Sequence, residues 1–278
     1  MKKHTFHSSP KYLGEIKDLA GSVDFILEVV DARAPEKTRN PIIKEIASSR
    51  KIILILNKAD LAYSEITARW VSCYQKNGLE ALSFEPGKPA NSIINLINQI
   101  KTKALKPRFK RALRIMVAGT PNVGKSTILN SLLKRKAVKT GDIAGITRGK
   151  QWIRLKPGLE LLDTAGILPP FISQSNRFYV ALLGIMPSSQ WDPYEVAAWL
   201  LREERPHKLI RDMEERYKVK NLAEKNAEDI LLTIGAQRGT LRSGGEIDLN
   251  RVTEIFLKEF RGGLLGRYSL EKPPETER

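Results

Sequence analysis

Residues 119–127 have the residue types and spacing of a phosphate-binding loop. They read Gly119-Thr-Pro-Asn-Val-Gly-Lys-Ser-Thr127 and fit the pattern G-x-x-x-x-G-K-[ST]. Glycine at 119 and 124 would let backbone N–H groups curve around a phosphate, because no Cβ blocks the approach. Lys125 would place its ammonium on the terminal phosphates, and Ser126 would ligate Mg²⁺. The residues expected to contact a nucleotide here are Asn122, Val123, Gly124, Lys125, Ser126 and Thr127.

Two later segments would complete the phosphate and metal site. Residues 161–166, LLDTAG, are an apolar run that ends in Asp-x-x-Gly, so Asp163 would reach Mg²⁺ through water and the Gly166 N–H would meet a γ-phosphate. The glycine-rich stretch 141–152 contains Thr147, which can offer its hydroxyl to Mg²⁺ and its N–H to the γ-phosphate. The predicted magnesium set is therefore Ser126, Thr147 and Asp163.

A base-reading motif follows another apolar run. Asn57-Lys58-Ala59-Asp60 comes directly after KIILIL. The Asp60 carboxylate can accept from N1–H and the amino group of guanine, whereas adenine presents an acceptor there and would leave a buried charge unpaired. Asn57 can bond the opposite edge of the base, and the Lys58 stem can lie along its plane. A helix-capping aspartate after a strand is the alternative explanation. Ser83 and the Phe84 backbone N–H, at the end of the next predicted strand, stand where G proteins carry a loop touching guanine O6.

The order of these motifs is unusual. In G proteins of ordinary order the phosphate loop comes first, but here Asn57–Asp60 precedes residues 119–127. Chemistry in a closed site depends on position in space and not on chain order. We therefore predict a circularly permuted P-loop GTPase domain in which both motifs are genuine.

Apolar periodicity predicts an α/β domain with a mostly parallel sheet covered on both faces, followed by an all-α domain. The boundary is expected near Pro170, giving domains 1–170 (with an N-terminal extension) and 171–278. Asp192 followed by Pro193 is a typical helix start. Strands are predicted at 23–30, 51–57, 79–84, 112–119, 151–155 and 159–163, helices between them at 41–49, 64–76, 91–103 and 124–135, and later helices at 178–185, 192–204, 206–218, 226–238 and 248–260.

Composition indicates the cellular compartment and the kind of binding partner. The apolar runs are too short to span a bilayer, the start has no signal-peptide segment, and the single cysteine is typical of a cytoplasmic protein. Net charge is +16, and all of that excess lies in residues 1–170, which hold 30 Lys and Arg against 14 Asp and Glu. Such an excess favours a polyanionic partner, above all nucleic acid.

These motifs together resemble the circularly permuted ribosome-assembly GTPases of the YlqF type (ribosome biogenesis GTPase A). Residues 29–41, VVDARAPEKTRNP, and 238–271 are similar to that family's Asp-Ala-Arg and C-terminal signatures. The resemblance implies GTP hydrolysis that is slow alone and stimulated by the ribosome, in late maturation of the bacterial large (50S) subunit. It also implies a helical domain contacting ribosomal RNA, in a monomer.

The group that supports hydrolysis is left open by the sequence. Ile167 stands where some GTPases carry the glutamine that orients water. The catalytic candidates are Lys125, Thr147, Gly166 and His7. The family usually begins with Phe-Pro-Gly-His-Met, and here His7 follows Phe6 directly, with no Pro-Gly between them. His4 and His7 can equally be solvated. The resemblance also implies K⁺ binding at Asn122, with an ordinary loop asparagine as the alternative.

Basic runs predict where RNA would bind. Residues 101–114 hold seven basic residues and no acid, and residues 134–156 hold eight and one acid. A solvated linker is the alternative for 101–114. Helical-domain candidates are Arg238, Arg242, Arg261 and Arg267. Two other functions stay open: a GTP-sensing RNA-binding module with negligible hydrolysis, and an ATP-dependent phosphotransferase, against which Asn57 and Asp60 argue.

Overall fold

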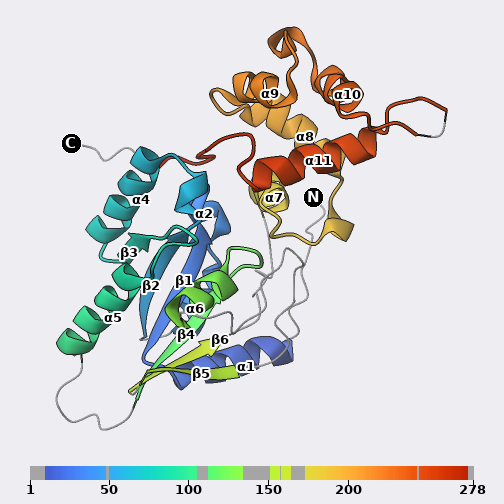
Figure 1. Cartoon of the computed structure of the whole chain (residues 1–278). Coiled ribbons are helices and arrows are strands. Elements are labelled where there is room, and N and C mark those ends of the chain that lie inside the picture. The colour runs from blue at the N-terminus through green and yellow to red at the C-terminus, as the bar shows by residue number, and fades with distance from the viewer. Residues whose placement is uncertain are drawn as a thin grey trace.

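The computed structural model describes residues 10–47, 50–104, 112–133, 151–156, 158–163, 173–242 and 244–274. Figure 1 shows a sheet with helices on both faces, and a group of helices, α7 to α11, beyond one end of the strands. We call these the sheet part and the helical part. The predicted combination of an α/β sheet with a following helical domain is confirmed.

The sheet has six strands in the order β3-β2-β1-β4-β6-β5, and every neighbouring pair is parallel except β5 with β6. β1 lies between β2 and β4, so the strand before the base-reading motif and the strand before the phosphate loop flank the same neighbour. The strand bounds are β1 Phe25–Asp31, β2 Lys51–Asn57, β3 Glu80–Ser83, β4 Leu113–Gly119, β5 Gln151–Lys156 and β6 Leu159–Asp163.

This strand order marks the edge of the sheet at which a ligand is expected. The chain runs outward from β1 to β2 to β3 and then returns to β4 on the other side of β1. Open α/β sheets bind ligands outside the carboxyl ends of their strands at such a reversal of strand order. The register sets Val29 opposite both Ile55 and Gly119, so the three strands reach that edge together.

Alternation along the strands distributes the core between the two faces. Leu27 and Val29 pack on the side of α5 (Asn91–Ala104) and α6 (Lys125–Leu133). Ile26 packs on the opposite side, against α1 (Pro10–Gly21) and α3 (Pro41–Ala47), while Val30 meets α4 (Ser64–Lys76). Both faces are thus buried, which explains why the strands read as nearly continuous Ile, Leu and Val runs.

The helical part surrounds α11, whose Val252, Phe256 and Phe260 are buried. Its helices are α7 Gln174–Leu182, α8 Pro193–Trp199 continued by the π-helix Leu200–Glu204, α9 Leu209–Tyr217, α10 Ala227–Arg238 and α11 Leu249–Arg261. An isolated antiparallel bridge joins Leu241 to Ile247. The predicted start at Asp192 is confirmed, because its carboxylate accepts from the N–H groups of Tyr194 and Glu195.

Three details differ from the sequence expectations. α1 and the four-residue helix α2 (Pro35–Thr38) were not predicted, and α7 begins and ends earlier than the predicted 178–185. α7 stops before Gly184, which has a φ of +74°. Among the described residues, no helix is long and apolar enough to cross a membrane.

Candidate nucleotide site

The phosphate loop connects β4 to α6, as the sequence predicts, and its shape depends on glycine. A Cβ on Gly119 would lie 2.4 Å from the Val29 carbonyl oxygen. Gly124 has a φ of +96°, and a Cβ there would lie 2.1 Å from Asn57 Nδ2. The loop therefore fits only because the backbone of one motif can approach the side chain of the other.

Lys125 lies folded into this loop. Its ammonium donates to the carbonyl oxygens of Thr120, at 2.9 Å, and Gly119, at 3.3 Å, and the residue is 8% exposed. An ammonium held by loop carbonyls at the N-terminus of α6 is placed to meet phosphate oxygens. The first residue of α6 thus provides the cation that the motif requires.

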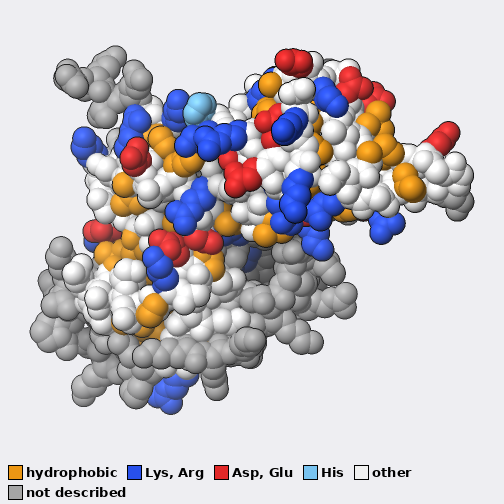
Figure 2. Space-filling model, turned by 45° about the horizontal axis from the view of Figure 1, so that its top comes forward, with side chains coloured by type: hydrophobic (Ala, Val, Ile, Leu, Met, Phe, Trp, Pro, Cys, Tyr) orange, Lys and Arg blue, Asp and Glu red, His pale blue; other side chains and the backbone are white. Residues whose placement is uncertain are grey.

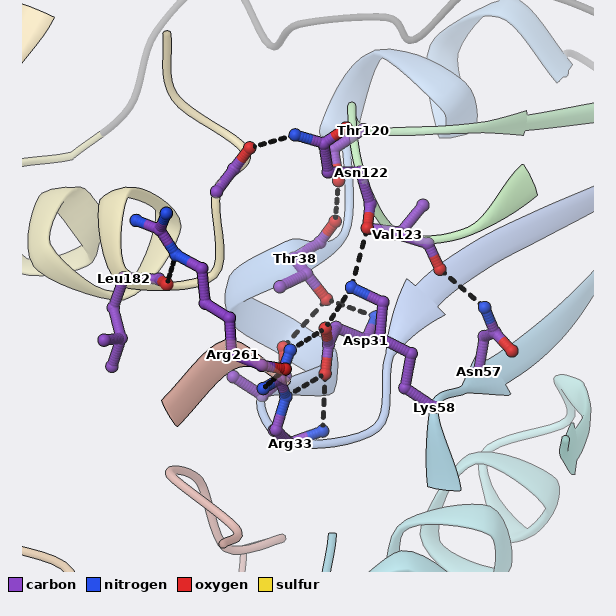
Figure 3. A network of polar contacts seen from close by, with 12 residues as sticks. Asp31, Arg33, Thr38, Asn57, Lys58, Thr120, Asn122, Val123, Leu182 and Arg261 are labelled. Atoms are coloured by element: carbon purple, nitrogen blue, oxygen red, sulfur yellow. Dashed lines mark hydrogen bonds and ion pairs between the residues drawn. The ribbon is translucent and has the colours of Figure 1, made fainter. Parts of the chain in front are cut away.

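The base-reading motif lies directly against the phosphate loop. Asn57 is fully buried, and its Nδ2 donates to the Val123 carbonyl at 2.7 Å. Lys58 takes a left-handed backbone conformation, with a φ of +59°, and its ammonium donates to the Asn122 carbonyl at 2.7 Å. The two motifs that stand in reversed order along the chain therefore form one site (Figure 3).

Two acceptors at this site have no donor. Asn57 Oδ1 and Asp60 Oδ1 are buried side-chain oxygens without a hydrogen-bond partner in the part of the chain that the structure describes. Buried polar atoms in folded proteins nearly always have partners, so each such acceptor calls for a donor from outside. Guanine offers N1–H and an amino group, which suits the Asp60 carboxylate, and the site therefore fits a guanine nucleotide.

Comparison with known proteins identifies the family. A model described as RsgA GTPase matches residues 8–168, and one described as 50S ribosome-binding GTPase matches residues 114–233. The protein called ribosome biogenesis GTPase A from Bacillus cereus is 36% identical over 264 residues, which cover 91% of this chain and 88% of that one. Its namesake from Thermotoga maritima is 30% identical over 94% of this chain and 90% of its own length.

A solved structure agrees with the sequence relatives. The crystal structure of GNP-bound YlqF from T. maritima has a TM-score of 0.69 and 28% identity, covering 96% of this chain and all of that one (100%). The chain belongs to the ribosome biogenesis GTPase A family. It is a GTPase with a circularly permuted P-loop domain, as the motif order predicted.

Ser83 and Phe84 are placed differently from each other in this GTPase. Ser83 ends β3 and is exposed. The Phe84 N–H donates to the Leu56 carbonyl at 2.8 Å, and the Phe84 carbonyl accepts from the Ala59 N–H at 3.1 Å. Phe84 therefore supports the base-reading loop from behind, and its N–H is engaged within the protein.

Of the other predicted site residues, the structure describes only some. Asp163 ends β6 in register with Val117 of the strand that leads to the phosphate loop, so it stands at the same edge of the sheet. Thr147, Gly166 and His7 lie outside the described residues, and their predicted roles stay predictions. The same is true of Ile167 and of the basic residues 105–111 and 134–150.

Two residues for which the sequence predicted ligand contacts, Asn122 and Arg261, also help to join the sheet and helical parts of the GTPase. Asn122 directs its Nδ2 to the Gly184 carbonyl at 2.6 Å. Arg261, predicted to meet RNA, donates to the carbonyls of Leu182 at 2.6 Å and Ala181 at 2.9 Å. Arg267 is exposed, while Arg238 pairs with Glu259 and Arg242 with Asp248.

Sequence reasoning missed the carboxylate beneath the base-reading motif. Asp31, the last residue of β1, lies 3.2 Å from the Lys58 ammonium. Burial alone would raise the pKa of the Asp31 carboxyl, but the Arg33 guanidinium and the Lys58 ammonium outweigh it and hold that pKa well below its usual range. The sequence signal for this carboxylate is Asp31-Ala-Arg33, directly after a predicted strand. The sequence analysis interpreted these residues only as part of the family's Asp-Ala-Arg signature.

Proposed function

We propose that this GTPase binds and hydrolyses GTP as an assembly factor in late maturation of the bacterial large (50S) ribosomal subunit. In this role it binds ribosomal RNA in a nucleotide-dependent manner, as a monomer in the cytoplasm. The names of its relatives and of the matching family model support the ribosomal assignment. The observation that carries the guanine assignment is the buried acceptor of Asp60 beside the joined loops.

The site residues divide by the part of the ligand they would meet. Asn57, Lys58 and Asp60 would bind the guanine base, with Ser83 at its O6 edge and Phe84 supporting the base-reading loop from behind. Residues 122–127 would enclose the phosphates. Mg²⁺, held through Ser126, Thr147 and Asp163, would neutralise charge on the phosphates. Lys125, Thr147, Gly166 and His7 would act in hydrolysis, and Asn122 would help to hold K⁺.

Ribosomal RNA would be bound mainly through charge. Figure 2 shows Lys and Arg side chains along the junction of the sheet and helical parts, interleaved with acidic ones. The exposed Arg267 is a further candidate, as is the basic run 101–114, of which residues 105–111 lie outside the described residues. Each phosphate neutralised by Lys or Arg releases a counterion, so binding should weaken steeply as salt rises.

The test is GTP turnover in potassium buffer with Mg²⁺, with and without purified large ribosomal subunits. Stimulation by the subunit is expected, together with subunit binding that differs between GTP and GDP. Nucleotide-dependent binding without stimulated turnover would select the GTP-sensing module with negligible hydrolysis. If the subunit alters neither binding nor turnover, the ribosomal assignment fails.

A charge variant tests the RNA contact separately. Replacing Lys106, Arg108, Lys110 and Arg111 together with alanine should weaken subunit binding and flatten its salt dependence, while GTP turnover without the subunit stays within about 2-fold, since these side chains are predicted to act through phosphate charge. Unchanged subunit binding would remove this run from the RNA surface.

A further inference from the structure

A buried ion pair lies between the guanine-reading loop and the helical part. Asp31 and Arg33 are each 1% exposed. Arg33 donates through Nε to Asp31 Oδ1 at 2.9 Å and through Nη2 to Oδ2 at 2.8 Å. Such a two-point contact fixes the plane of the guanidinium as well as its position. The Asp31 N–H, in turn, donates to Thr38 Oγ1 at 3.0 Å, which anchors the end of β1.

On one side the pair holds the residue that should lie along the base. Asp31 Oδ2 is 3.2 Å from the Lys58 ammonium, which also donates to the Asn122 carbonyl at 2.7 Å. The ammonium is thus fixed between the end of β1 and the phosphate loop. Because the Asp31 carboxylate is buried, solvent screens this attraction little.

On the other side the pair reaches the helical part. Arg33 Nη1 donates at 3.1 Å to the carbonyl of Arg261, the last residue of α11. The Arg33 carbonyl accepts from the Leu270 N–H at 2.8 Å. Arg33 therefore contacts the helical part through both its side chain and its backbone.

The segment after α11 also contacts residues 61–63, which directly follow the guanine-reading motif. The Tyr268 N–H donates to the Leu61 carbonyl at 2.9 Å, and the Tyr63 N–H donates to Ser269 Oγ at 3.2 Å. A Cβ on Gly263 would lie 2.5 Å from Leu61 Cδ2, so the Gly263 backbone packs closely against the Leu61 side chain. The stretch 61–63, directly after the base-reading motif, is thus held by residues 263–269.

A third contact closes a ring of interactions. Asn122 donates to Gly184 at 2.6 Å, and Arg261 donates to Leu182 at 2.6 Å, so the phosphate loop and α11 meet the same turn after α7. Figure 3 shows the ring passing from Lys58 through Asp31 and Arg33 to Arg261, and back to Asn122. Displacing the helical part would therefore remove contacts from both loops of the nucleotide site.

We propose that Asp31 and Arg33 are positioning residues for guanine-nucleotide binding, and that through them the docked helical part slows nucleotide release. This inference rests on the guanine site proposed above. Through Asp31 the contacts hold Lys58 of the base-reading loop. Because GDP and GTP carry the same base, the contacts should act equally on both nucleotides. A partner that pulls the helical part away would accelerate nucleotide release.

The test compares dissociation rates of fluorescent GDP and of a fluorescent, non-hydrolysable GTP analogue from the full-length protein. Asp31→Asn keeps the shape but removes the charge, and Arg33→Lys keeps a charge but removes the two-point contact. Both should accelerate release of both nucleotides by about 10-fold or more, the size expected when a charge-assisted contact is lost. The affinity for both nucleotides should fall by a similar factor, because affinity differences between variants of one site arise mainly from the release rate.

Two further variants separate positioning from general stability. Glu28→Gln removes another carboxylate of β1 that is also 1% exposed, and that accepts from Arg39 and from the Asn40 N–H. It should leave the release rates within about 2-fold of the wild type, even where it lowers the melting temperature. Ser269→Ala removes one contact from the helical side and should accelerate release modestly, which keeps the proposal testable if Asp31→Asn does not fold.

Some results would overturn the proposal. Release from Asp31→Asn and Arg33→Lys that matches Glu28→Gln would reduce the pair to a structural role. Faster release of only one of the two nucleotides would contradict contacts that act on the base shared by GDP and GTP. Failure of the wild-type protein to bind guanine nucleotides would instead reject the proposed site, so the two failures are distinguishable.

Discussion

The carboxyl edge of the sheet and the interior of the helical part bury different kinds of side chain. At the edge, Asp31, Arg33, Asn57 and Lys125 are all buried, and acceptors of Asn57 and Asp60 have no partner among the described residues. In the helical part the buried side chains are mainly apolar, gathered around α11. Buried polar groups without partners cost stability. The other such atoms among the described residues, the hydroxyls of Tyr74 in α4 and Tyr217 in α9, lie apart from each other. The two acceptors that stand together at the edge therefore indicate where the protein binds a ligand, whereas the apolar core of the helical part holds its shape.

Gly124→Ala should break the polar edge most severely. The added Cβ would fall 2.1 Å from Asn57 Nδ2, at a backbone φ of +96°. We expect GTP affinity to fall by more than about 100-fold, because the two loops can no longer meet. Isothermal titration measures this, with circular dichroism as the control for folding. Affinity within about 3-fold of the wild type, in a folded variant, would show that the loops need not touch.

Asp60→Asn should alter the choice of base. An amide can donate to the C2 carbonyl of xanthine while accepting from its N1–H, but it meets the amino group of guanine with the wrong polarity. GTP affinity should fall by about 100-fold or more and affinity for xanthosine triphosphate should rise, as a site built for hydrogen bonds rejects mismatched partners. Equal loss of both nucleotides would mean that Asp60 does not read the base.

Asp31 predicts a difference in acid stability. Its pKa is lowered in the folded protein, so its contribution is fully present above the ordinary carboxyl value of about 3.9 and is lost as pH falls toward the folded pKa. The melting temperature of the wild type should therefore fall more steeply than that of Asp31→Asn below about pH 4. Thermal melts of both proteins across this range measure the difference. Parallel curves would contradict a charged, paired Asp31.

Asp192→Ala should have the smallest effect and should leave the edge untouched. The variant removes the cap of α8, where the carboxylate accepts from Tyr194 and Glu195. A loss of about 1 kcal/mol in the free energy of unfolding is expected. GTP affinity measured alongside should not change, and a large loss of affinity would contradict the division between the two regions.

Local patterns predicted much of this molecule. Apolar runs such as KIILIL gave the strands, and the glycine spacing of the phosphate loop gave a site between strand and helix, because both depend on near neighbours in sequence. The reversed order of two complete motifs also predicted the circular permutation. Each of these features depends on residues that are close together in the sequence, so it can be predicted from the sequence alone.

The joint between the parts could not be predicted in this way. Arg33 meets a residue 228 positions away, and Asn122 one 62 positions away, and nothing local signals either contact. Asp31-Ala-Arg33 looks like an ordinary exposed turn after a strand, yet both charged side chains are buried against α11 and Lys58. α2 was missed because its four residues are too few for a periodic pattern.

A competition between GTP and ATP for bound fluorescent GDP, with Mg²⁺ present, tests most directly whether the two motifs form one guanine site. The buried acceptor of Asp60 predicts that GTP displaces the probe at concentrations at least about 100-fold lower than ATP, because adenine offers no donor to that oxygen. Equal displacement by ATP and GTP would contradict a guanine-reading role for Asn57 to Asp60 and, with it, the account of a permuted guanine site.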